Sequence, residues 1–243
     1  VSMAVLSAHF IKKNNRFRVL SGVHFSGKCW LDICALGVSS LISELSSGIV
    51  IIVFNFLILS LNGNTGVAAY GIIANIALVL VAVFTGIAQG IQPIVSKCAA
   101  AGNMKDSSEN SAVRSIRRYA LISALLLALI AYTAVTVWSV PIADLFNRDH
   151  NPALTEIAAG GMKIYFISLF FSGINIVTAS FLSSADRPKR AFAVSILRCF
   201  VLIIPAAWIL SRLAGLTGIW MAVPVTEGIV CVLALIFLFH LTE

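Results

Sequence analysis

The chain has 243 residues, of which 59% are hydrophobic and 11% are charged, and its formal net charge is +7. Soluble domains carry roughly a quarter charged residues, so this composition excludes an ordinary soluble domain and indicates a membrane protein. The basic residues lie in short segments between apolar runs rather than on one amphipathic face, so we expect no nucleic-acid partner.

The N-terminal residues 1–30 are predicted to hold the end of a membrane span and a basic cytoplasmic loop. The chain begins with VSMAVLSAHFI, which is about half of the roughly 20 residues that a helical span requires. Several basic residues and no acidic residue follow this stretch; they are Lys12, Lys13, Arg16, Arg18 and Lys28. We interpret the start as a truncated span and the chain as a fragment.

Residues 31–243 contain apolar segments that each exceed the roughly 20 residues a helix needs to cross a bilayer. The six segments are Ile33–Leu61, Val67–Val95, Tyr119–Ile142, Met162–Ser184, Phe192–Leu213 and Thr217–Phe239. A barrel would instead show strands of about 10 residues with alternating apolar and polar side chains. The predicted fold is therefore all-α, a polytopic helical membrane protein with one six-helix lobe.

The connectors between these segments alternate in basic content. Lysine and arginine gather before the first segment, after the second and after the fourth, whereas the connectors at 61–66, 147–153 and 213–218 contain few. Basic loops stay in the cytoplasm. We expect a multi-pass protein of the plasma membrane whose C-terminus is cytoplasmic.

Glu44 interrupts the first segment. A span that starts near Ile33 places it about 16 Å deep, near the middle of a hydrocarbon layer about 30 Å thick. A central acidic residue costs roughly 2.5–3.5 kcal/mol to insert and normally faces a cavity or a partner. We predict that Glu44 is an ion-coupling site for a proton or, as a ligand, for sodium. The alternatives are a glutamate fixed by a neighbouring hydroxyl or amide, or one solvated by a vestibule.

Uncharged amides in the spans are predicted to line a substrate cavity. Asn55 follows Glu44 on the same helical face, and the second and fourth spans carry the other amides. The predicted cavity residues are Asn55, Asn75, Gln89, Gln92 and Asn175. Such amides suit varied ligands, but hydrogen bonds between helices, worth about 0.6 kcal/mol on average, are the alternative explanation.

Arg198 and Glu227 interrupt the last two segments at depths that allow contact if their helices are neighbours. We predict either a buried structural pair or, through Glu227, a second ion-coupling site. Arg198 alone could instead extend to the cytoplasmic surface.

Enzymatic motifs are missing from the sequence. It contains no G-x-S-x-G, no H-E-x-x-H and no glycine loop of the Walker type, so we expect no enzyme. The five cysteines and four histidines are scattered, which argues against a metal site. We therefore expect no cofactor, and an ion gradient of protons or sodium as the energy source. A scaffold without transport activity remains the alternative from another class.

Four segments carry a resemblance to a known family: SSLISELSSGIVIIVFN (39–55), GNTGVAAYGIIANI (63–76), GIAQGIQPIVSKCAAAGN (86–103) and GLTGIWMAVPVTEGI (215–229). Together they resemble the C-terminal half of a multidrug and toxic compound extrusion (MATE) transporter. The resemblance implies an antiporter of two six-helix lobes that expels small lipophilic cations in exchange for protons or sodium. The partners implied are these cations, the lipid bilayer and a missing N-terminal lobe.

By the same comparison, Glu44 matches an acidic residue of the family's seventh helix, and Gln89 and Gln92 fall in a polar motif of its eighth. The span Met162–Ser184 has no acid where some relatives carry an aspartate. The alternative within the superfamily is a flippase for lipid-linked oligosaccharides or a polysaccharide exporter. Such cavities hold pyrophosphate with several basic residues, and Arg198 is the only basic residue that lies away from the ends of the six segments.

Overall fold

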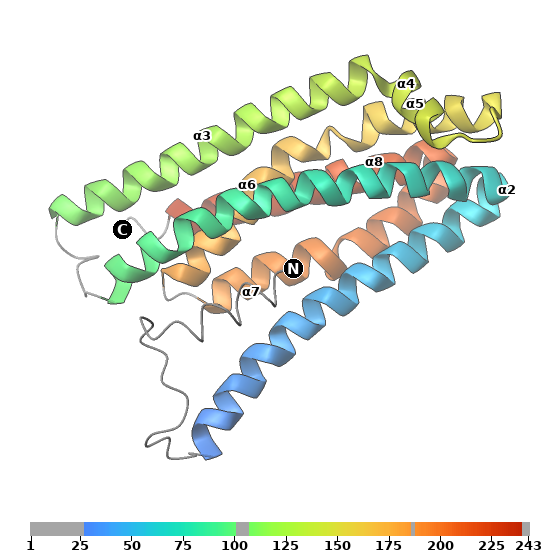
Figure 1. The fold of residues 1–243 in the computed structure, drawn as a ribbon. Helices are drawn as coiled ribbons and strands as arrows, with labels where there is room; N and C mark the ends of the chain where they lie inside the picture. The colour runs from blue at the N-terminus through green and yellow to red at the C-terminus, as the bar shows by residue number, and fades with distance from the viewer. Residues whose placement is uncertain (1–26, 101–106, 186–187, 240–243) are drawn as a thin grey trace, which may run out of the picture. The chain divides into compact units, whose positions relative to one another are not determined.

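The computed structural model describes the backbone of residues 27–100, 107–185 and 188–239 (Figure 1). Side chains are described for residues 48–98, 113–185 and 190–238. The chain divides into two units, Val1–Leu41 and Ile42–Glu243. Of the first unit, the structure describes residues 27–41, which begin the first described helix, and all contacts reported below lie within the second unit.

The described residues form helices and no strand. The elements are α2 (Gly27–Ala100), α3 (Ser107–Val137), α4 (Ser139–Phe146), α5 (Pro152–Tyr165), α6 (Ser168–Ser184), α7 (Pro188–Ile196), the π-helical turn η2 (Leu197–Val201) and α8 (Ile203–Phe239). The predicted all-α fold is confirmed.

The two longest elements, α2 and α8, are each a pair of helices joined at a glycine. Gly63 has φ 62° and ψ −156°, and Gly215 has φ 58° and ψ −133°. Only glycine adopts such a conformation without strain, because it has no Cβ. At these breaks α2 and α8 double back on themselves (Figure 1). The breaks fall in the predicted connectors 61–66 and 213–218.

Within the described part of the chain, three helical stretches have the length and apolar composition to cross a membrane: Gly48–Cys98, Val113–Val137 and Arg190–Leu238. The pair α5 and α6, bent by 50°, would make a fourth span. The first and third stretches contain 51 and 49 residues, and each holds two helices across its glycine break. These stretches include parts of all six segments expected from hydropathy, the first of them only from Gly48 onward.

Three segments differ from the regular spans that were expected, and the third, Tyr119–Ile142, is broken at Trp138 between α3 and α4. The fourth begins ten residues earlier than Met162, at Pro152, because Asn151 caps the helix by accepting a hydrogen bond from Ala153 N at 3.1 Å. Hydropathy misses this start because α5 opens with polar and small residues. The fifth is interrupted by η2, where Leu202 N donates to Leu197 O at 3.2 Å.

Small residues allow these helices to approach one another closely. Ala124 and Ala128 of α3 are fully buried in the core. A Cβ on Gly173 of α6 would lie 3.1 Å from the Phe84 ring of α2, and one on Gly161 of α5 would lie 2.8 Å from Ile73 Cδ1. Packing through small residues is typical of helices in lipid, where the hydrophobic effect does not drive helices together.

Candidate functional site

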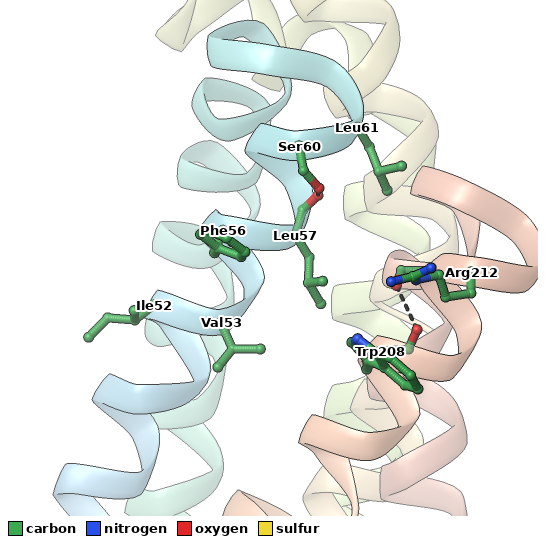
Figure 2. A pocket seen from close by; sticks show the side chains of 9 residues that line it. Ile52, Val53, Phe56, Leu57, Ser60, Leu61, Trp208 and Arg212 are labelled. Carbon is green, nitrogen blue, oxygen red and sulfur yellow. Dashed lines mark hydrogen bonds between the residues drawn. The ribbon is translucent and has the colours of Figure 1, made fainter.

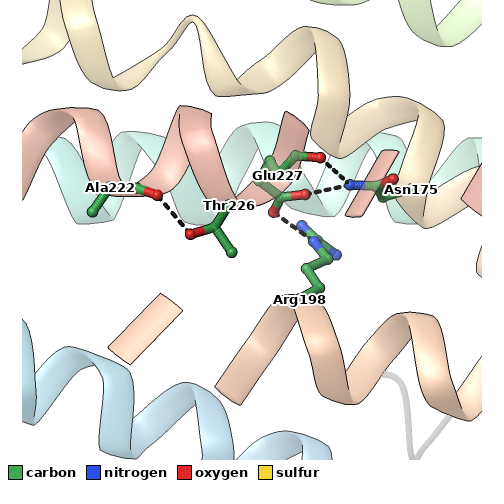
Figure 3. A network of polar contacts seen from close by, with 5 residues as sticks. All are labelled: Asn175, Arg198, Ala222, Thr226 and Glu227. Atoms are coloured by element: carbon green, nitrogen blue, oxygen red, sulfur yellow. Dashed lines mark hydrogen bonds and ion pairs between the residues drawn. The ribbon is translucent and has the colours of Figure 1, made fainter. Parts of the chain in front are cut away.

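A buried ion pair joins the fifth and sixth segments (Figure 3). Arg198 Nε donates to Glu227 Oε1 at 2.5 Å, and the two side chains are 20% and 8% exposed. Asn175 Nδ2 of α6 donates to Glu227 Oε2 at 2.7 Å and to the Glu227 carbonyl at 3.0 Å. Both carboxylate oxygens of Glu227 therefore accept a hydrogen bond inside the protein.

Irregular backbone places the two charged residues of this cluster. Arg198 lies in η2, and a π-helical turn changes the direction of the side chains relative to a regular helix. Glu227 follows Pro224 within α8, and proline removes one hydrogen bond of the helix because it has no N–H group. Backbone irregularities of this kind occur often at functional sites.

The ion pair forms part of the wall of a cavity of about 270 Å³. The other walls come from both helices of α2, including Val50, Ile51 and Tyr70, and from Tyr165 at the end of α5. The Tyr70 ring stacks with Phe54 and Trp220, at centroid distances of 5.5 and 6.2 Å. The cavity thus combines apolar and aromatic walls with one paired carboxylate.

The polar cluster retains unused hydrogen-bonding capacity. Asn175 Oδ1 and Thr178 Oγ1 are buried in α6, and neither has a hydrogen-bond partner among the described residues. A buried acceptor without a partner is costly, so such groups commonly bind water or an ion. The described residues contain no group of three or more His, Cys, Asp or Glu side chains that could hold a metal ion.

Glu44 lies in the helical part of α2 but outside the residues whose side chains are described. Its predicted role as an ion-coupling site or sodium ligand stays a prediction. Ile51 does line the cavity, and it occupies the helical face that the sequence assigns to Glu44.

The other predicted cavity residues are not brought together at this site. Asn55 is half-buried, and Asn75 is exposed and donates to Gly71 O of its own helix at 2.8 Å. Gln89 is exposed, and Gln92 donates to Ser180 Oγ at 2.9 Å. None of these four residues lines the cavity beside Glu227. The structure thus groups Asn175 with Arg198 and Glu227, and leaves the remaining amides elsewhere.

The two aromatic residues of the cavity lining, Tyr70 and Tyr165, were not anticipated from the sequence. A tyrosine in an apolar run is a signal that could have been used, because its hydroxyl needs a polar partner when the ring is buried. Tyr70 is 4% exposed.

Comparison with known proteins gives matches along most of the chain. The MatE family model matches residues 39–209. The multidrug export protein MepA of Staphylococcus haemolyticus is 23% identical over 210 residues, which are 86% of this chain and 44% of that protein. MepA of Staphylococcus saprophyticus is 22% identical over 236 residues, 97% of this chain and 50% of that protein. The chain thus spans about half the length of these relatives.

Solved structures share the fold. A multidrug resistance MATE family transporter of the MOP superfamily, in an outward-facing conformation, superposes with a TM-score of 0.86 at 17% identity, over 99% of this chain and 54% of that one. A MOP superfamily transporter from Pyrococcus furiosus gives a TM-score of 0.86 at 15% identity, over 99% and 53%. Because the family model covers more than half of the chain, the chain belongs to the MATE family of membrane transporters.

Proposed function

We propose that the chain is one lobe of a cation-coupled antiporter that exports lipophilic cationic compounds across the plasma membrane. Family membership supports transport, and the similarity to proteins named for multidrug export supports this class of substrate. Since the chain spans about half of those relatives, the proposal includes a second six-helix lobe that faces this one. Binding sites of two-lobe transporters lie near the middle of the bilayer, between the lobes.

The observation that carries the proposal is the carboxylate of Glu227 beside a cavity. When ionised, it accepts hydrogen bonds from Arg198 and Asn175. A proton or sodium ion that binds this carboxylate competes with Arg198, so it loosens the connection between η2 and α8. In this way ion binding would bias the lobe between two helix arrangements, which is what coupling requires.

The shape and lining of the cavity support a lipophilic cationic ligand. Tyrosine rings attract organic cations and the apolar walls exclude strongly hydrated ones, whereas the Glu227 carboxylate becomes available to a cation only when Arg198 is displaced. A volume of about 270 Å³ falls short of the roughly 300–1,000 Å³ that sites for drug-sized molecules occupy. A complete site would therefore need a further surface, which the proposed second lobe would supply.

The test measures ethidium efflux from cells that express this chain together with any residues that its gene encodes before Val1 or after Glu243. Glu227→Gln and Glu44→Gln should each abolish efflux at equal protein level. Glu156→Gln is the matched control, because Glu156 is exposed on α5 away from the ion pair, and it should leave efflux unchanged. Full efflux by Glu227→Gln would refute the proposal for this residue.

A double variant separates a coupling role of Glu227 from a purely structural one. If the pair only holds the helices together, Arg198→Gln combined with Glu227→Gln removes both charges and should restore efflux. If Glu227 couples ion movement to export, efflux stays lost although the protein is folded. We expect the second result.

The flippase alternative receives less support from the geometry. The substrates of a flippase carry pyrophosphate, which needs basic side chains that are free to bind it. Arg198 is instead paired with Glu227. Normal ethidium resistance in Glu227→Gln cells, together with impaired flipping of cell-wall precursors, would favour the flippase over the drug exporter.

A further inference from the structure

An apolar groove of about 510 Å³ lies between the first helix of α2 and the first helix of α8 (Figure 2). Its α2 wall includes Ile52, Phe56, Leu57 and Leu61, and its α8 wall includes Trp208 and Arg212. It shares no lining residue with the cavity beside Glu227. The groove is thus a separate feature from the proposed transport site.

The groove begins next to the two glycine breaks. Leu61 and Arg212 occupy the last turn before Gly63 and Gly215, where α2 and α8 reverse direction. In helices that cross a bilayer, these reversals lie at the membrane surface. From Leu61 to Ile52 the α2 wall extends about 14 Å at 1.5 Å per residue, close to half of a hydrocarbon layer about 30 Å thick. The groove therefore has the length of one lipid acyl chain.

Arg212 supplies a cation at the surface end of this groove. It is exposed, and its guanidinium carbon lies 5.3 Å from the centroid of the Trp208 ring. Stacking on the ring face leaves the N–H groups at the edge of the guanidinium, which match the oxygens of a phosphate. The ion pair between Arg198 and Glu227 is the only one found among the described residues, so Arg212 has no carboxylate partner there.

Among the described residues, the apolar wall of the groove is exposed. Ile52 is 68% exposed and Phe56 is 72% exposed, and no other described part of the chain covers them. Trp208 is 55% exposed, and tryptophan is enriched near the membrane surface, where the reversal at Gly215 is expected to lie. A long apolar wall that ends in a tryptophan and an unpaired arginine matches the chemistry of a phospholipid, with its acyl chain and its phosphate.

We propose that this groove binds one phospholipid, whose phosphate contacts Arg212 and whose acyl chain lies along the α2 wall from Leu61 to Ile52. The proposed ligand needs both a phosphate and an acyl chain. A diacylglycerol lacks the phosphate, and inorganic phosphate lacks the acyl chain. The proposal does not depend on the transport function, and its test needs no transport.

The test is native mass spectrometry, in mild detergent, of the protein purified together with any residues that its gene encodes on either side of this chain. The probes are palmitoyl-oleoyl phosphatidylglycerol, a diacylglycerol with the same acyl chains, and inorganic phosphate as a competitor. Arg212→Gln removes the charge, and Arg212→Lys keeps it. Arg148→Gln is the matched control, because Arg148 is also exposed in a connector but does not line the groove. Helical content by circular dichroism verifies that each variant is folded.

We expect one phosphatidylglycerol to bind tightly to each chain, diacylglycerol to bind more weakly, and inorganic phosphate not to displace the lipid. Arg212→Gln should weaken lipid binding about fivefold, the effect of one basic residue near a membrane surface, while Arg212→Lys and Arg148→Gln should not. Equal weakening by Arg212→Gln and Arg148→Gln would overturn the proposal, as would equal affinity for diacylglycerol. Displacement by inorganic phosphate would also overturn it, because the site would then bind a free anion. If Arg212→Gln does not fold, the relative affinities of the unaltered protein for phosphatidylglycerol and diacylglycerol test the proposal.

Discussion

At the scale of single residues, Glu227 is tolerated in the interior because Arg198 and Asn175 both donate to it. Removing one partner of a buried pair leaves the other charge uncompensated, which costs about 3–5 kcal/mol in soluble proteins. We expect Glu227→Gln to lower the thermal unfolding temperature, measured by circular dichroism in detergent. The double change Arg198→Gln with Glu227→Gln should be less harmful than Glu227→Gln alone. Additive effects of the two single changes would show that the pair contributes no coupling energy.

At the scale of elements, the glycine breaks decide that α2 and α8 each form a hairpin. At Gly63 and Gly215 a Cβ would meet no atom within 4 Å, so the cost of alanine there comes from the backbone alone. Conformations that only glycine tolerates cost about 1–3 kcal/mol in other residues. We expect Gly63→Ala and Gly215→Ala to lower the unfolding temperature.

The matched control for these two changes is Gly71→Ala. Gly71 is a helical glycine of α2 that also has open space around its Cβ position. Alanine is favoured over glycine inside a helix by roughly 1 kcal/mol, so this change should leave the protein equally or more stable. An equal loss of stability in all three variants would contradict the assignment of the two breaks.

At the scale of the whole molecule, the basic connectors predict that both ends of residues 31–243 face the cytoplasm. Green fluorescent protein fused after Glu243 should fluoresce in bacterial cells, because it folds in the cytoplasm. Alkaline phosphatase fused after Asp149, in the connector between α4 and α5, should be active because it lies outside. Activity of the phosphatase after Glu243 would reverse the predicted orientation.

The helical fold class, the membrane environment and the two glycine connectors at 61–66 and 213–218 follow from the amino-acid sequence alone. These features are local: a span needs only enough consecutive apolar residues, and a reversal needs residues that leave the helix. The sequence also allowed contact between Arg198 and Glu227, since their estimated depths agree, but it left open whether their helices are neighbours.

Which polar residues meet depends on how the helices pack, and it is visible only in the folded protein. In the folded protein Asn175 donates to Glu227, and Arg198 lies in the π-helical turn η2. Tyr70 and Tyr165 line the same cavity, whereas Asn75 and Gln89 are exposed. Hydropathy cannot supply this information, because lipid and protein interior are similarly apolar. The choice of neighbours among membrane helices depends on close packing at residues such as Gly161 and Gly173, which is a property of the assembled helices.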